Sequence, residues 1–201
     1  RVLTTTRLHV IIRPRGGDFL YSPLELERMP ADIDMARELG ADGVVFGCLR
    51  ADGSLDTEAN AMLMQHAKGM SVTFHRAFDR CAHPHQALEE LISQGFDRIL
   101  TSGQQPTALE GTPLLKELHE QAKGRIILLA GCGVNEQNIA TIAQATNIHE
   151  FHFSARTAVK SKMQFSNPDV YMGAKDADED TLNITSSQRV AHTIEACLKG
   201  V

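Results

Sequence analysis

The stretch RIILLAGCGVN, residues 125–135, decides how this chain folds. Its first six residues are apolar on both faces of an extended chain, which is typical of a parallel strand covered by helices. A glycine-containing turn then leads to Asn135, a residue type that caps helices. A strand, a tight turn and a helix in that order predict a βα unit, the repeating element of parallel α/β folds.

The same pattern recurs along the chain about every 27 residues, a spacing typical of βα barrels. Helix starts are indicated between the apolar segments by capping residues and prolines, and helix ends by glycines. The expected strands lie at 8–12, 43–48, 71–75, 98–101, 125–130 and 150–154, and the expected helix starts at Ser22-Pro23, Asp56, Pro84, Thr107 or Thr112-Pro113, and Asn135.

Alternating strands and helices with short loops imply parallel strands joined by right-handed crossovers. An open doubly wound sheet and a barrel both satisfy this, but the short repeat and the polar strand ends favour a TIM-like (β/α)8 barrel. Only six units are visible, and the chain starts at Arg1 without Met. We therefore expect one barrel domain over residues 1–201 whose first two βα units precede Arg1, in a natural protein of roughly 250 residues or more.

Residues 156–184 lack a clear periodicity and predict an irregular loop before a final helix at 187–198. The acidic run at 176–180 favours a solvated loop over a metal-binding one, because such runs are commonly disordered.

Composition excludes several classes of function. The 201 residues carry a net charge of −5, without clustered Lys or Arg, which argues against nucleic-acid and anionic-membrane binding. No apolar run approaches the roughly 20 residues of a membrane span. Four scattered cysteines without CxxC spacing indicate a reducing compartment, so a cytoplasmic location is expected.

Polar and charged residues follow each expected strand, where parallel barrels carry their sites. This concentration of cations, hydroxyls, imidazoles, glycines and a carboxylate indicates a binding or catalytic face. The residues concerned are Arg13, Arg15, Cys48, His75, Asp79, Ser102, Gly131, Cys132, Gly133, His152 and Ser154.

An anionic ligand is the first chemistry these residues suggest. Arg13 and Arg15 flank a stiffening proline, and guanidinium groups bind carboxylate or phosphate with two parallel hydrogen bonds. One of the two is expected to pair with Asp18 and brace the loop, with Arg13 the better candidate to point into the barrel mouth. Ser102, placed in the turn after the fourth expected strand, is a further candidate anion ligand.

The glycine turn adds a second candidate anion site. Gly131 and Gly133 precede an expected helix N-terminus, where backbone amides favour anions, and Ser154 follows the next strand. A tight turn that simply requires small residues is the alternative.

His75 and Asp79 are the candidate catalytic pair. A histidine at a strand end can act as a general acid or base near neutral pH. The alternative is a hydrogen-bonded core histidine, and the sequence leaves both open. For a metal, Cys48, Cys132 and His152 are candidate ligands because Cu(I) prefers thiolates and imidazoles, but no spacing among them is diagnostic.

Several motifs resemble one known family. They are IRPRGGDFLYS at 12–22, ELGADG at 38–43, TFHRAFD at 73–79, LTSG at 100–103, GCGV at 131–134 and FHFSA at 151–155. In this order and spacing they resemble the CutC copper homeostasis family over essentially the whole chain.

The resemblance implies a cytoplasmic TIM-like barrel that forms homodimers or larger homo-oligomers and handles copper, with Cu(I) as its bound ion. Members of the family carry two further βα units upstream, and the cysteines usually proposed as Cu(I) ligands belong there. The resemblance therefore gives no ligand role to Cys48 or Cys132.

Two functions follow as hypotheses. The first is a CutC-like copper homeostasis protein that binds or handles intracellular copper. The alternative is a TIM-barrel enzyme acting on a small anionic substrate, for instance a phosphorylated one, through the polar mouth. Whether the chain is an enzyme stays open, as does a purely structural or interaction role.

Overall fold

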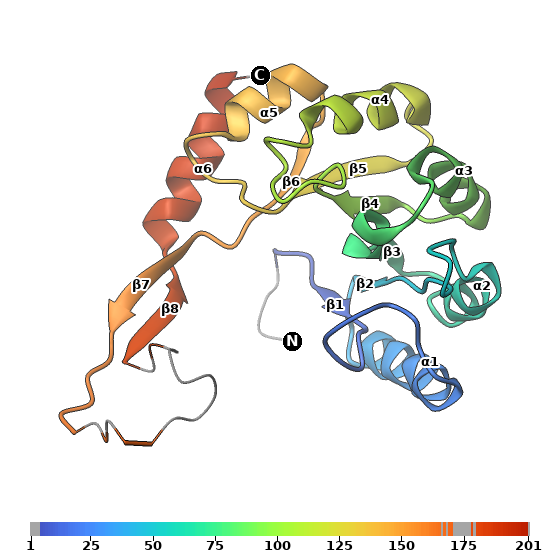
Figure 1. The fold of residues 1–201 in the computed structure, drawn as a ribbon, viewed down its shortest axis with the longest axis horizontal. Coiled ribbons are helices and arrows are strands. Elements are labelled where there is room, and N and C mark those ends of the chain that lie inside the picture. The colour runs from blue at the N-terminus through green and yellow to red at the C-terminus, as the bar shows by residue number, and fades with distance from the viewer. Residues whose placement is uncertain (1–4, 166, 168, 171–177, 179, 201) are drawn as a thin grey trace.

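The computed structural model describes all residues except 1–4, 166, 168, 171–177, 179 and 201. Its main feature is a curled sheet of six strands in which every strand pairs, in parallel, with the next one along the chain (Figure 1). The strands are β1 (His9–Ile11), β2 (Gly43–Phe46), β3 (Ser71–Phe74), β4 (Arg98–Thr101), β5 (Ile127–Gly131) and β6 (Glu150–His152).

Helices connect consecutive strands and cover the outer side of the curl (Figure 1). This arrangement confirms the TIM-like parallel α/β fold, with β1 and β6 as the edges of the sheet. The helices are α1 (Pro23–Glu38), α2 (Thr57–His66), α3 (Pro84–Gln94), α4 (Thr112–Ala122), α5 (Ile139–Thr146) and α6 (Ser187–Gly200), and a 3-10 helix η1 (Arg76–Arg80) follows β3. None of the helices in the described part of the chain is long and apolar enough to span a membrane.

Aromatic side chains pack the core beneath the centre of the sheet. Phe46 and Phe74 are fully buried at the ends of β2 and β3, and each lies edge-on to Phe96, with ring centroids 5.4 and 5.5 Å apart. Each such buried ring stabilises the fold by about 1.5–3 kcal/mol. This packing fixes the point where β3 ends and the polar residues begin.

Several helix starts follow the sequence signals. Ser22 and Glu25 form a capping box at α1, and the Asp56 side chain accepts a hydrogen bond from the Ala59 amide at α2. The fifth helix differs, because it begins at Ile139 rather than directly after Asn135.

The prediction of an irregular loop over 156–184 is wrong at both ends of that range, where the chain forms β-strands. β7 (Arg156–Lys160) pairs antiparallel with β8 (Thr181–Thr185), and this hairpin projects away from the sheet (Figure 1). The two strands form a ladder in which Val159 faces Leu182. The alternation of apolar and polar residues in each strand is too short to predict a strand from the sequence. The prediction of a solvated acidic run falls largely on residues outside those described, which include 176, 177 and 179.

Candidate functional site

The carboxyl ends of β1–β6 lie along one rim of the sheet because all six strands are parallel. We call this rim, with the loops that follow the strands, the mouth. The candidate residues from the sequence follow its strands, and apart from Cys48, which follows β2, they lie in three separate places. These are a charged cluster after β3 and β4, a pocket after β5 and β6, and a buried histidine beside the loop after β1.

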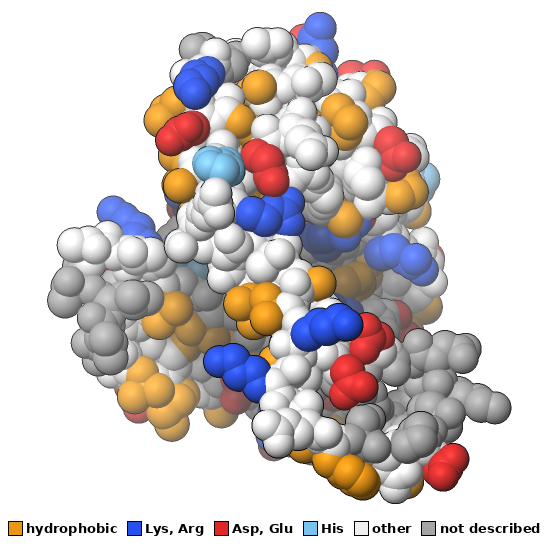
Figure 2. Space-filling model, turned by 90° about the vertical axis from the view of Figure 1, so that its left-hand side faces the viewer, with side chains coloured by type: hydrophobic (Ala, Val, Ile, Leu, Met, Phe, Trp, Pro, Cys, Tyr) orange, Lys and Arg blue, Asp and Glu red, His pale blue; other side chains and the backbone are white. Residues whose placement is uncertain are grey.

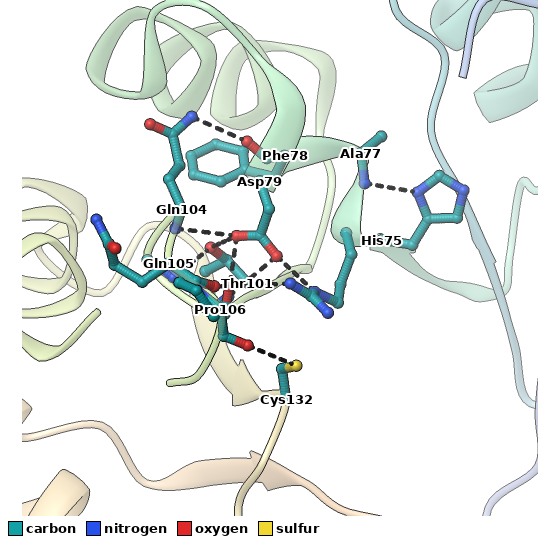
Figure 3. A network of polar contacts seen from close by, with 12 residues as sticks. His75, Ala77, Phe78, Asp79, Thr101, Gln104, Gln105, Pro106 and Cys132 are labelled. Atoms are coloured by element: carbon teal, nitrogen blue, oxygen red, sulfur yellow. Dashed lines mark hydrogen bonds and ion pairs between the residues drawn. The ribbon is translucent and has the colours of Figure 1, made fainter. Parts of the chain in front are cut away.

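The charged cluster is organised by Asp79 in η1 (Figure 3). Its Oδ2 accepts from Arg76 Nε at 2.6 Å, and its Oδ1 accepts from the Thr101 hydroxyl at 2.5 Å and the Ser102 amide at 2.9 Å. The Gln104 amide donates to the same Oδ1 at 3.2 Å. We call Arg76, Asp79, Thr101 and Ser102 the Arg76 cluster.

The cluster presents a guanidinium group rather than a carboxylate. The Asp79 side chain is only 6% exposed and its oxygens already accept hydrogen bonds from four donors, whereas the Arg76 side chain is 41% exposed. Arg76 Nη2 also donates to the Ser102 hydroxyl at 3.0 Å. Asp79 therefore holds Arg76 in a fixed orientation, and a role for Asp79 in moving protons stays a prediction that this geometry does not favour.

A pocket of about 300 Å³ lies at the ends of β5 and β6. Arg76 does not line it, but its guanidinium interacts electrostatically with two residues that do, Cys132 and His152. Four of the sequence candidates line it together: Cys132, Gly133, His152 and Ser154. The pKa of the His152 imidazole is lowered, first by its partial burial and second by the charge of the nearby Arg76. We call this space the β5–β6 pocket.

Two further arginines border the β5–β6 pocket, Arg156 of β7 and Arg189 of α6. Arg189 is paired with Glu136 at 3.0 Å and donates to the Arg156 carbonyl. Figure 2 shows Lys and Arg side chains spread over the face that carries α6 and the β7–β8 hairpin, with acidic side chains among them.

The glycine turn after β5 has an unusual backbone. Cys132 and Gly133 both have positive φ angles, 83° and 72°, so the second position favours glycine and the first is strained. A side chain at Gly131 would meet Leu100 Cδ1 at 2.5 Å, which explains the glycine there.

The backbone amides at the start of α5, which the sequence suggests as an anion site, are partly used by hydrogen bonds within the protein. The Asn135 amide donates to Asn138 Oδ1, and the Gln137 amide donates to Asn135 Oδ1, both at 2.9 Å. These side chains form the turn that delays α5 to Ile139. The helix end is therefore less available to an anion than the sequence predicts, and anion binding at Gly133 and Ser154 stays a prediction.

His75 lies apart from the Arg76 cluster and points away from Asp79 (Figure 3). The ring is 3% exposed and packs against Phe19, with centroids 4.8 Å apart. Burial, aided by the nearby Arg13 charge, lowers the pKa of His75 to about 4. His75 is therefore neutral near pH 7, and the structure does not join it to Asp79 as a pair.

The two arginines of the loop after β1 have different surroundings. Arg15 forms ion pairs with Asp18 at 2.8 Å and Glu25 at 2.7 Å, and so braces the loop against α1. Arg13 donates to the Gly17 carbonyl at 2.8 Å, and its guanidinium lies 4.7 Å from the Phe19 ring centre. Arg13 is thus the one on the His75 side of the mouth.

The three candidate metal ligands do not all come together: Cys132 and His152 line the β5–β6 pocket, but Cys48 lies apart from them. Cys48 follows β2 and Cys132 follows β5, with two strands between them. Burial, with a smaller effect of Asp56, raises the pKa of the Cys48 thiol to about 12, which keeps it protonated. Within the described residues, no group of three or more His, Cys, Asp or Glu side chains is placed to hold a metal ion.

Arg76 is the residue that the sequence candidates omitted. Its signal was its place between the β3 strand and Asp79, three residues later, where a single helical turn brings the two side chains together.

The fold and the mouth define a TIM-barrel-type α/β protein with a cationic site at the carboxyl ends of its strands. A CutC family model matches residues 1–157. A family protein CutC of Bacteroides thetaiotaomicron is 63% identical over 196 residues, which cover 97% of this chain and 79% of that protein. The copper homeostasis protein cutC homolog of Homo sapiens is 48% identical over 193 residues, covering 96% and 70%. The chain belongs to the CutC family of copper homeostasis proteins.

Solved structures agree. CutC from Streptococcus agalactiae matches with a TM-score of 0.70 at 37% identity, covering 73% of this chain and 71% of that chain. An aldolase named QR15 matches with a TM-score of 0.58 at 19% identity over 75% of this chain and 69% of that chain, which is a likeness of fold alone.

Proposed function

We propose that the mouth of this CutC family protein binds a small anionic molecule, and that the protein acts on it as a TIM-barrel enzyme. The observation that carries the proposal is the fixed Arg76 guanidinium beside the β5–β6 pocket. Asp79 holds one edge of that guanidinium through Nε, and Nη2 is bonded to Ser102. A pre-oriented guanidinium next to a pocket with Gly133 and Ser154 suits a carboxylate or phosphate group.

Direct Cu(I) binding is the second candidate, since copper homeostasis is the name under which relatives are known. Its support is that Cys132 and His152, a soft and a borderline ligand, line the same pocket. The charge near them argues against it: burial and, second, the Arg76 charge lower the pKa of His152, and the same charge would repel a bound cation. The described residues therefore fit an anion better than Cu(I).

We further propose a cytoplasmic, homo-oligomeric protein. All four cysteines lie among the described residues and are unpaired, which suits a reducing compartment. Leu24, Met35 and Leu39 leave exposed apolar side chains, 68%, 54% and 72% exposed, on and next to α1, and a second copy would cover them. Sedimentation velocity of the wild type and of Met35→Lys tests this, and a monomeric wild type would contradict it.

Calorimetric titration with inorganic phosphate tests the main proposal. We expect binding to the wild type and a loss of about tenfold or more in Arg76→Gln, equal to about 1.4 kcal/mol. Arg125→Gln is the matched control, because Arg125 pairs with Glu89 at the helix surface and should leave binding unchanged. A wild type that ignores phosphate yet binds Cu(I) more tightly than a competing chelator would favour the copper hypothesis instead.

A further inference from the structure

Two buried polar atoms in the mouth have no hydrogen-bond partner in the described part of the chain. They are the hydroxyl of Tyr21, in a residue 7% exposed, and Nε2 of His75, in a residue 3% exposed. An unpaired buried donor costs about 1–3 kcal/mol, so native proteins pair nearly all of them. Two such atoms in residues that follow β1 and β3 therefore indicate a missing partner molecule.

The hydrogen bond at Nδ1 of His75 shows which ring nitrogen carries the proton. Nδ1 accepts a hydrogen bond from the Ala77 amide at 3.2 Å (Figure 3), so the neutral ring carries its proton on Nε2. Gly47 also packs closely against the ring, because a Cβ atom at that position would lie 3.0 Å from Nδ1. His75 is consequently a fixed hydrogen-bond donor rather than an acid or base.

Tyr21 and Arg13 add donors of the same kind. Burial raises the pKa of Tyr21 to about 12, although Arg13 and Arg15 oppose the rise, so the phenol keeps its proton. Arg13 is the charged neighbour of both side chains, since it also contributes to the lowered pKa of His75. A neutral N–H, a phenol and a guanidinium together match a carboxylate, which only accepts hydrogen bonds.

We propose that His75, Tyr21 and Arg13 form a carboxylate-binding subsite at the β1–β3 side of the mouth. The inference rests on the proposed function and deepens it, because it makes the substrate a small organic acid with a second anionic group for Arg76. Phe19 contacts both Arg13 and His75, with its ring centre 4.7 Å from the Arg13 guanidinium and 4.8 Å from the His75 ring centre. It also borders a cleft of about 490 Å³ that the three subsite residues do not line. The subsite therefore requires the half-buried Phe19 ring to turn toward that cleft and admit the carboxylate to Nε2.

Two probes that differ only in the carboxylate test the subsite: 3-phosphoglycerate and glycerol 3-phosphate, titrated into the protein by calorimetry, with inorganic phosphate alongside. We expect the wild type to prefer 3-phosphoglycerate by about tenfold or more. Tyr21→Phe and His75→Asn should reduce that preference to about threefold or less, and should leave the affinity for inorganic phosphate unchanged. Asn is chosen because its oxygen can still accept from the Ala77 amide.

The thermal stability of Tyr21→Phe without ligand is a second readout. We expect no loss, because the hydroxyl makes no hydrogen bond of good geometry in the free protein, although the Arg13 guanidinium is close enough to influence it. A wild type that binds phosphate but shows no preference between the two probes would overturn the subsite and leave the proposed function intact. A preference that survives in both variants, or a clearly lowered melting temperature in Tyr21→Phe, would overturn it as well. Failure of all three compounds to bind would refute the proposed function itself.

Discussion

Burial of His75 makes the stability of the protein depend on pH in a defined direction. The pKa falls from its ordinary value of 6.5 to about 4 on folding, mainly through burial. Between these values the unfolded chain binds more protons than the folded one, so stability falls as the pH is lowered below 6.5 and is insensitive to His75 above it. The difference costs about 2 kcal/mol at pH 5 and about 3 kcal/mol below pH 4.

Urea unfolding of the wild type and of His75→Asn at pH 7.5, 6 and 5 isolates this contribution. Other groups titrate over the same range, so the quantity of interest is the difference between the two proteins. We expect the wild type to lose about 2 kcal/mol more than His75→Asn between pH 7.5 and 5. Asn substituted for the exposed His149 is the matched control and should follow the wild-type curve. Parallel curves for wild type and His75→Asn would refute the buried neutral state.

Three further outcomes follow from the geometry. Asp79→Asn should lower the free energy of unfolding by about 2 kcal/mol and also weaken phosphate binding, because the carboxylate holds Arg76 and accepts a hydrogen bond from the Ser102 amide. Urea unfolding measures the first effect and calorimetry the second. An unchanged affinity for phosphate would show that Arg76 needs no support from Asp79. Ser22→Ala should cost about 1 kcal/mol in urea unfolding by removing the capping box of α1, and a neutral result would contradict its assigned role. Gly131→Ala should lower the melting temperature by several degrees, because the new Cβ would lie 2.5 Å from Leu100 Cδ1 and 3.2 Å from His152 Cβ. An unchanged melting temperature would mean that the Leu100 side chain turns aside at little cost.

The sequence was sufficient for the repeating architecture, because strands buried on both faces and helices marked by caps are local signals. Ser22 and Asp56 cap their helices as expected, and the six strands follow one another in the sheet. The β7–β8 hairpin was missed because its alternation covers five residues on each strand and its ladder joins segments about 25 residues apart, a pairing that periodicity does not reveal.

The candidate site was predicted in composition but not in arrangement. Parallel pairing explains why the candidate residues share one rim of the sheet, yet hydrogen bonds decide their roles. Asp79 accepts hydrogen bonds from four donors, so it positions Arg76. The neutral state of His75 depends on Phe19 and Gly47, which come from other strands' loops and are distant in the sequence.

We propose that the mouth binds an anion at Arg76 rather than a copper ion. Crystals of the protein grown with tungstate, an anion that mimics phosphate and scatters X-rays anomalously, test it most directly. The structure predicts an anomalous peak within hydrogen-bond distance of the Arg76 guanidinium, in the β5–β6 pocket beside Gly133 and Ser154. A mouth without tungstate, together with a copper peak at Cys132 and His152 in crystals soaked with Cu(I), would contradict it.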